Sequence, residues 1–159
     1  MKADEIKNIR ESLGLTQREF AQKLGVTPLT ISHWETGSRR PSSLAVKAIL
    51  MLEKIEKQDT DKRRFVRETF DRLNRCHFEG ILKDYQVELS TRLKRCLGKA
   101  FPKRRLIRLS FPHLERKNWQ NLEDILKHEM LHCYLYEKGY PVSHSLKFKT
   151  MLEKLKKTK

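Results

Sequence analysis

The chain has 159 residues, of which 38% are hydrophobic and 35% are charged, and its formal net charge is +15. No apolar run approaches the roughly 18 residues that a membrane span needs, and the N-terminal MKADEIKNIRESLG lacks the apolar region of a secretory signal. Three scattered cysteines, Cys76, Cys96 and Cys133, form no C-x-x-C pair and indicate a reducing compartment. We therefore expect a cytoplasmic protein.

The positive charge is unevenly distributed. Residues 1–57 carry ten Lys/Arg against seven Asp/Glu, whereas residues 58–159 carry twenty-five against thirteen. Excess positive charge attracts polyanions and favours association with nucleic acid through phosphate contacts. A solvated surface is an equal alternative for any single run such as residues 103–105. The imbalance across the whole chain predicts a polyanionic partner.

One segment without apolar residues, KQDTDKRR at residues 57–64, separates two patterned regions. We therefore predict an N-terminal domain over residues 1–57, a linker over residues 58–64 and a second domain over residues 65–159.

The first region predicts an all-α domain of five short helices. Ile6, Ile9 and Leu13 recur at helical spacing and define the buried face of the first helix. Thr16 begins T-Q-R-E, in which a threonine N-cap is followed three residues later by Glu19, a capping box for the second helix.

The third helix is predicted to begin at Thr27, with Pro28 at the first helical position, where a missing N–H has no cost. Ile31 and Trp34 form its inward face, and a longer amphipathic helix is expected over residues 44–55. Two short helices joined by a tight glycine turn predict a helix-turn-helix, whose second helix can enter the major groove.

The string LGLTQREFAQKLGVTPLTISHWETGSRRPS resembles the Cro and phage-repressor (XRE) type of helix-turn-helix, over residues 5–56. This resemblance implies a DNA-binding domain. In that family the residue matching Gln17 contacts backbone phosphate, and the positions of Pro28, Leu29, Ser32 and His33 face base edges.

Pro28 and Leu29 cannot make the bidentate hydrogen bonds that long amides or arginine offer to bases, although Leu29 could touch a thymine methyl group. Arg39 and Arg40, just past the third helix, favour phosphate contact. A protein-interaction module built on a DNA-binding fold is the alternative. The candidate DNA-contacting residues are Gln17, Thr27, Pro28, Leu29, Thr30, Ser32, His33, Arg39 and Arg40.

The second region predicts an α+β domain. Phe65, Val66, Phe70 and Leu73 are spaced for burial in a helix over residues 63–77. Alternating segments then predict strands over residues 86–101 and 105–109, joined by a turn at Pro102-Lys103 into a small antiparallel sheet. A strand face rich in Arg and Lys could bind phosphates, although solvation of the charged side chains is the default explanation.

The motif HEMLH lies on the next predicted helix, for which Asn118 or Asn121 can cap the start. His128 and His132 are four residues apart, so their imidazoles lie on one helix face and can share a metal ion. Glu129 beside them is the expected general base, the catalytic residue that takes a proton from a water activated by zinc.

Catalytic zinc needs three protein ligands and one open position. His144 ranks first as the third ligand, because a chain that reverses after Gly139 can return it to the ligand face. The lower-ranked candidates are His113, His77 and Cys133. The predicted cofactor is therefore one catalytic Zn²⁺.

Residues 65–153 resemble the SprT-like (Spartan-type) metallopeptidases, through FDRLNRCHFEGIL, VELSTRLKRCLGKAF, RLIRLS, LEDILKHEMLHCYLYEKG and SHSLKFKTML. The resemblance implies a gluzincin-like α+β fold, in which His128, His132 and His144 match the zinc ligands and Glu129 the catalytic acid/base. Ser145-Leu146 stands where that family commonly has Gly-Pro. Family members often act on proteins bound to DNA, including covalent crosslinks.

Two enzymatic function classes and one non-enzymatic class follow. The first is a peptidase that cleaves proteins on or near double-stranded DNA, with single-stranded DNA as a further option. The second is a transcriptional regulator whose peptidase domain processes itself or a partner repressor, with a homodimer through the helix-turn-helix as one arrangement. A non-enzymatic DNA binder with a structural zinc ion is a third, and Glu129 argues against it. Tyr134, Tyr136 and Tyr140 are candidates for stabilising the oxyanion, although aromatic packing explains each of them better.

Overall fold

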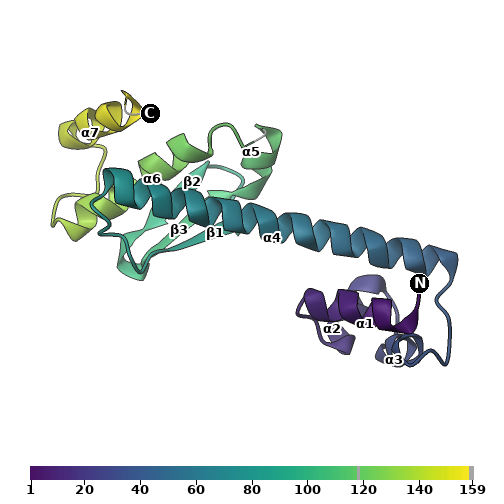
Figure 1. Cartoon of the computed structure of the whole chain (residues 1–159). Helices are drawn as coiled ribbons and strands as arrows, with labels where there is room; N and C mark the ends of the chain where they lie inside the picture. Colours follow the sequence, from purple (N-terminus) through teal and green to yellow (C-terminus); the bar gives the residue numbers. More distant parts are fainter. Residues whose placement is uncertain (118, 158–159) are drawn as a thin grey trace. The chain divides into compact units, whose positions relative to one another are not determined.

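The computed structural model describes residues 1–117 and 119–157, and the chain divides into two compact units, Met1–Lys62 and Arg63–Lys159. Each unit has its own hydrophobic core. Figure 1 labels the helices and strands of both units.

Unit 1 contains α1 (Ala3–Ser12), α2 (Gln17–Leu24), α3 (Pro28–Glu35) and the first part of α4 (Ser43–His77). The described part of this unit therefore holds four helices, where five were predicted. The predicted buried faces are confirmed, since its core consists of Ile6, Phe20, Ala21, Ile31, Trp34 and Ile49.

The predicted helix caps of unit 1 are confirmed as well. Thr16 Oγ1 accepts a hydrogen bond from the Glu19 backbone N–H, while the Thr16 N–H donates to the Glu19 carboxylate at 2.9 Å. At α3, Thr27 Oγ1 accepts a hydrogen bond from the Thr30 N–H. These local bonds satisfy the free N–H groups of the first helical turns and fix where α2 and α3 begin.

The segment predicted as a linker is helical. α4 runs without interruption from Ser43 to His77, so the two helices expected over residues 44–55 and 63–77 are one helix. The segment 57–64 contains neither Pro nor Gly, and ion pairs such as Lys57–Glu53 at 2.7 Å support a charged helix. The absence of apolar residues in this segment did not require the helix to end.

Unit 2 is built around a three-stranded sheet with the order β1-β3-β2. The strand predicted over residues 86–101 is two strands, β1 (Gln86–Ser90) and β2 (Gly98–Phe101). β2 pairs antiparallel with β3 (Leu106–Ser110) through the turn η1 (Pro102–Arg104), but β1 pairs with β3 in parallel. The sheet is therefore mixed, and the prediction of an antiparallel sheet is wrong for β1.

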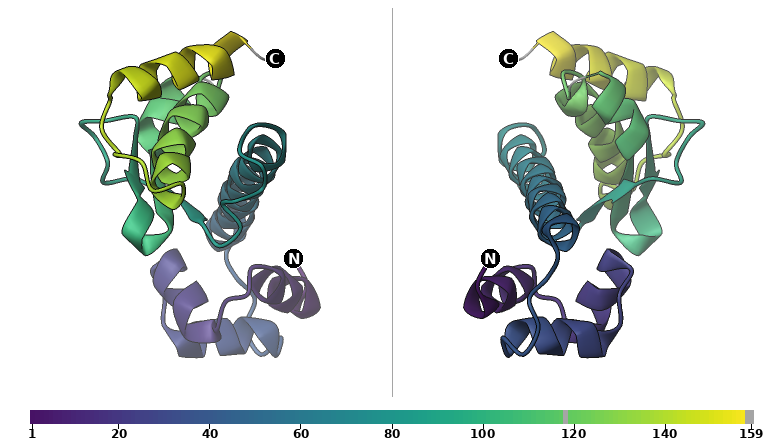
Figure 2. Two further views of the ribbon diagram at one scale, coloured as in Figure 1. Left: turned by 90° about the vertical axis from the view of Figure 1, so that its left-hand side faces the viewer. Right: turned by 90° about the vertical axis from the view of Figure 1, so that its right-hand side faces the viewer.

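The helices of unit 2 are the end of α4, α5 (Phe111–Arg116), α6 (Leu122–Glu137) and α7 (Leu146–Lys157). α7 packs against α6 (Figure 2). The core holds Phe70 and Leu73 of α4, Ile107 and Leu109 of β3, and much of α6. Asn121 stands at the N-cap of α6 without a side-chain capping bond, and Asn118 lies outside the described residues.

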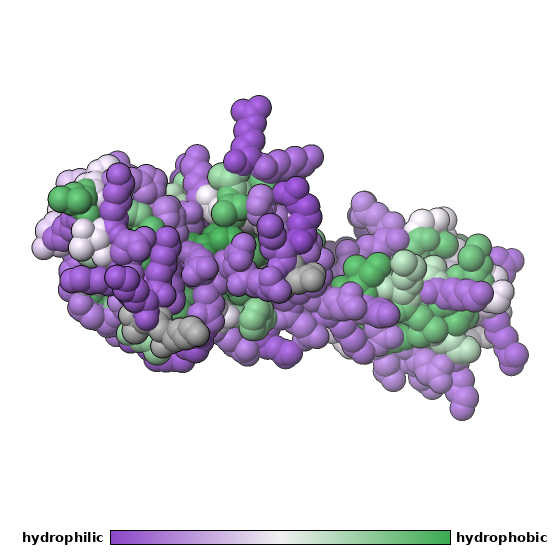
Figure 3. Space-filling view, turned by 90° about the horizontal axis from the view of Figure 1, so that it is seen from above, coloured by the Kyte–Doolittle hydropathy of each residue, from purple (hydrophilic) through white to green (hydrophobic). Residues whose placement is uncertain are grey.

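Hydrophilic side chains cover most of the face presented in Figure 3, with hydrophobic patches between them. Cys76, Cys96 and Cys133 are all free thiols. Within residues 1–117 and 119–157, every helix is too short or too polar to cross a membrane.

Candidate metal centre

The helix α6 carries the HEMLH motif at the centre of unit 2. Ile125, Leu126, Met130 and Leu131 are buried in the core and hold α6 in place. Since residues four apart lie on one helix face, His128 and His132 project from the same side of α6. Their Nε2 atoms are 3.3 Å apart.

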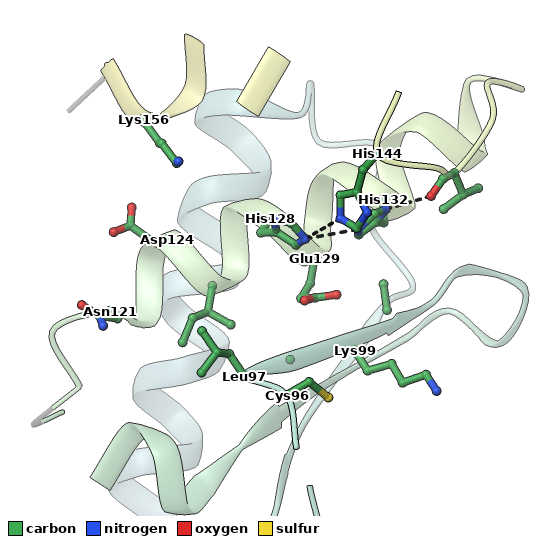
Figure 4. Close-up of a pocket in the computed structure, with 14 residues that line it drawn as sticks. Cys96, Leu97, Lys99, Asn121, Asp124, His128, Glu129, His132, His144 and Lys156 are labelled. Atoms are coloured by element: carbon green, nitrogen blue, oxygen red, sulfur yellow. Dashed lines mark hydrogen bonds between the residues drawn. The ribbon is translucent and has the colours of Figure 1, made fainter. Parts of the chain in front are cut away.

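His144 approaches from the segment between α6 and α7. α6 ends at Glu137, and Gly139, with φ +72°, turns the chain back. His144 Nε2 then lies 3.1 Å from His128 Nε2, and ligand atoms of all three histidines lie within 4.8 Å of one another. Figure 4 shows the three rings facing a common point above Glu129.

The environment of His132 fixes its ring orientation. Its Nδ1 lies 3.1 Å from the Val142 carbonyl oxygen, so an N–H at Nδ1 donates to that oxygen and leaves a lone pair on Nε2. The buried ring of Phe148 stacks on His132 at a centroid distance of 4.4 Å. Burial, together with the neighbouring His128 and His144, lowers the pKa of His132 to about 4. The imidazole is therefore neutral at pH 7, as a metal ligand must be.

Glu129 lies between α6 and the edge strand β2. Glu129 is only 8% exposed. This burial raises the pKa of its carboxyl to about 7, although a hydrogen bond from the Ala100 backbone N–H acts in the opposite direction. Gly98 lies so close that a Cβ atom there would be 2.8 Å from Glu129 Cγ. The strand therefore both donates to the carboxylate and limits where it can lie.

A pocket of about 810 Å³ opens over this cluster. The three histidines and Glu129 share it with the β2 residues Gly98, Lys99 and Ala100 and with a polar end formed by Asn121, Asp124 and Lys156. A concave pocket in which a few polar groups converge is typical of a ligand-binding site.

The lower-ranked ligand candidates lie elsewhere among the described residues. His113 Nδ1 is 3.1 Å from Arg116, and His77 is likewise outside the cluster that His144 completes. Cys133 is buried, and burial raises the pKa of its thiol to about 12, which disfavours the thiolate that binds metals.

The tyrosines considered for oxyanion stabilisation do not line the pocket in the part of the chain that is described. The Tyr134 hydroxyl donates to Glu79 at 2.7 Å, and the Tyr140 ring is covered by the Lys147 ammonium. Tyr136 is 39% exposed.

The donor set fits a zinc ion. Imidazole nitrogens are preferred zinc ligands, and two ligands bound tetrahedrally at Zn–N distances of 2.0–2.1 Å lie roughly 3.3 Å apart. The spacings of His128 Nε2 from the other two Nε2 atoms, 3.3 and 3.1 Å, match that value, and the whole ligand set lies within 4.8 Å. Three imidazole nitrogens with a carboxylate beside them leave a fourth position open, whereas closed structural sites use four protein ligands.

In unit 1, α3 presents the predicted base-facing positions. Pro28 and Leu29 are exposed, Leu29 at 64%, while Ser32 and His33 are half-buried. Thr27 and Thr30 bond to one another through their hydroxyl groups. Arg39 and Arg40 are exposed after α3.

The side chain of Gln17, which was expected to contact backbone phosphate, is bonded within unit 1. Its Nε2 donates to Glu35 Oε2 at 2.8 Å, and the Arg10 guanidinium binds both Glu35 oxygens. This network joins α1, α2 and α3. Sequence reasoning missed it because the three residues are far apart in the chain.

Two known family models match the chain, one over each of its two regions. A model of the SprT-like family matches residues 66–159, and a helix-turn-helix model matches residues 6–52. The chain belongs to the SprT-like family, with an N-terminal helix-turn-helix of the XRE type fused to the SprT-like domain. It thus combines a DNA-binding domain with a peptidase-related domain. No curated protein and no solved structure gives a significant match.

Proposed function

We propose that this protein is a DNA-binding zinc metallopeptidase that cleaves proteins on or near DNA. In this proposal residues 1–57 bring the chain to DNA, and residues 65–159 carry out the hydrolysis. The observation that carries the proposal is the convergence of three imidazoles beside a buried carboxylate in an open pocket.

His128, His132 and His144 would hold the zinc ion. A bound zinc ion would supply Lewis-acid chemistry, lowering the pKa of a water molecule and polarising the scissile carbonyl group. The Val142 carbonyl keeps the His132 Nε2 lone pair directed at the cluster, and Phe148 holds the ring in place. Membership in the SprT-like family, which is related to peptidases, supports these three histidines as the metal ligands.

Glu129 is the proposed general base. Its carboxylate faces the pocket, where it would take a proton from the attacking water and pass it to the leaving amine. The Ala100 N–H orients the carboxylate, and Gly98 leaves room for it. Burial on α6 keeps the group from swinging into solvent.

A regulatory peptidase is the second candidate function. Exposed Leu29 and half-buried His33 on α3 could contact specific bases, which would direct the chain to an operator. The peptidase domain would then process the chain itself or a partner repressor. Selection of bound duplexes separates the two: a fixed operator favours the regulator, and indifference to sequence favours general processing of proteins on DNA.

The proposal is tested by incubating the zinc-loaded chain with a DNA-binding protein, in the presence and absence of the DNA to which that protein binds. We expect fragments to form faster when both proteins share the DNA, and no fragments with Glu129→Gln. The same fragment pattern from the wild type and from Glu129→Gln would refute the proposed peptidase activity. Equal cleavage rates with and without DNA would refute only the proposed recruitment by DNA.

A further inference from the structure

One face of the sheet in unit 2 carries exposed, charged side chains at its centre. Glu88 of β1, Arg108 of β3 and Lys99 of β2 are paired across the three strands, so their side chains lie on one face. The opposite face carries the apolar residues Ile107 and Leu109, which are buried in the core. Arg108 bonds to Glu88 at 2.9 Å, and both side chains remain more than 40% exposed.

The loop between β1 and β2 forms a wall beside this face. Its sequence, TRLKRCL at residues 91–97, has three basic residues and no acidic residue. Buried Ser110 anchors it, since its hydroxyl donates to the Leu93 carbonyl at 2.6 Å and its N–H donates to the Leu97 carbonyl at 2.8 Å. The loop and the sheet face enclose a groove of about 460 Å³.

The groove, which we call the β-face groove, is lined by residues that include Arg92, Lys99, Phe101 and Arg108. The half-buried Phe101 ring has the Lys99 ammonium 5.3 Å and the Arg108 guanidinium 5.6 Å from its centroid. An aromatic ring flanked by cations offers a stacking surface for a base and partners for the phosphates on either side of it.

Lys99 connects this groove with the metal centre. It lines both the β-face groove and the histidine pocket, because β2 is the edge strand between them. Figure 4 shows its side chain extending from β2 away from the histidine cluster. A ligand in the groove would therefore pass within one strand's width of Glu129.

We propose that the β-face groove binds single-stranded DNA, as a second nucleic-acid site beside the helix-turn-helix. This inference goes beyond the proposed function and does not depend on peptidase activity. The groove is too small to admit a duplex, whereas an unpaired base can enter it and stack on Phe101. The helix-turn-helix in the same chain supports DNA as the strand bound.

The groove would also place unpaired DNA next to the pocket in which a protein chain is cut. A protein held on that strand would then lie beside the metal centre, independently of where the helix-turn-helix binds. An acidic peptide could satisfy the basic side chains, but a nucleic acid presents a flat ring beside every phosphate group and so matches both the cations and Phe101.

The test is the affinity of the full chain for a fluorescent oligothymidylate of about 12 nucleotides, measured by anisotropy at several salt concentrations. We expect Arg92→Glu to weaken binding by about tenfold and to reduce the salt slope by about 0.7 or more. Phe101→Leu keeps an apolar side chain but removes the ring, so it should weaken binding about fivefold with little change in slope.

Lys149→Glu, on the exposed surface of α7, is the matched control, and it should bind the oligonucleotide nearly as the wild type does. Duplex binding and the thermal unfolding midpoint should be unchanged in Arg92→Glu. Wild-type affinity in both groove variants would overturn the proposal. Equal losses in Lys149→Glu, or tighter binding of polyglutamate or of an oligoribonucleotide than of the oligothymidylate, would overturn it as well.

Discussion

Gly98 of β2 lies directly against Glu129 of α6: a Cβ atom at position 98 would be 2.8 Å from Glu129 Cγ and 3.0 Å from Oε1. Real Cβ atoms essentially never come within 3.0 Å of another heavy atom, so a side chain at this position must shift the Glu129 side chain or β2 and change their relative position. Gly98 does not have a positive φ, and alanine could adopt its backbone conformation.

We expect Gly98→Ala to lower the rate of peptide cleavage by about 100-fold, since a displacement of about 1 Å of a reacting group has this effect. Zinc content should be unchanged, because the histidines are not touched. Cleavage kinetics and metal analysis on the same preparation check this. Gly80→Ala is the control: no atom lies within 4 Å of its Cβ, and with φ +68° it should cost about 1 kcal/mol of stability while leaving cleavage by the folded protein intact.

Removal of the third imidazole should release the metal. We expect His144→Ala to weaken zinc binding by more than the roughly 10- to 100-fold that loss of a supporting residue costs. The measurement is the zinc content after competition with a chelator of known affinity. His113→Ala, which lies outside the cluster, should keep its zinc, and full retention by His144→Ala would show that the third ligand is another residue.

The Arg10–Glu35–Gln17 network predicts a dependence of unit 1 stability on pH. Burial raises the pKa of Glu35, but hydrogen bonds from Arg10 and Gln17 outweigh it and hold the pKa below its ordinary value of 4.5. A carboxyl with a lowered folded pKa contributes stability above its unfolded pKa and loses it as the pH falls through the folded value.

At pH 7, Glu35→Gln should therefore destabilise unit 1 by about 3 kcal/mol, since it leaves the largely buried Arg10 with only the longer, 3.4 Å contact to the exposed Glu11 carboxylate. The difference from the wild type should shrink as the pH falls below the ordinary carboxyl pKa of 4.5. Urea unfolding followed by Trp34 fluorescence in a Trp119→Phe background measures both quantities. A difference that stays constant down to pH 3 would contradict the assigned role of the carboxylate.

The two kinds of DNA-contacting residue in unit 1 should behave differently. Arg39→Ala and Arg40→Ala should each weaken binding to all duplexes alike and reduce the salt slope by about 0.9, as loss of one phosphate contact does. His33→Ala should change the preference among sequences by about 1–3 kcal/mol at one base pair. Affinities for random and selected duplexes distinguish these outcomes. If all three variants changed these affinities in the same way, base recognition by α3 would be refuted.

Local patterns predicted the features that depend on neighbouring residues. The caps at Thr16 and Thr27 and the pairing of His128 with His132 follow from spacings of three or four residues along a helix. The position of His144 needed only a reversal at Gly139. Helix geometry fixes such relationships before any tertiary contact forms.

Relationships across the sheet could not be predicted in this way. The parallel pairing of β1 with β3, and the placement of β2 against α6, depend on contacts between distant segments. The roles of Gly98, Ala100 and Phe148 were missed for that reason. The continuous helix through residues 57–64 was missed for another: a charged segment without Pro or Gly is as compatible with a solvated helix as with a loop.

The most direct test of the central claim is to titrate zinc into the metal-free full chain while following cleavage of a DNA-bound protein. The account predicts that cleavage appears as zinc approaches one equivalent per chain and that Glu129→Gln binds the same amount of zinc without cleaving. Cleavage by Glu129→Gln at the wild-type rate, or cleavage by the wild type without added metal, would contradict it.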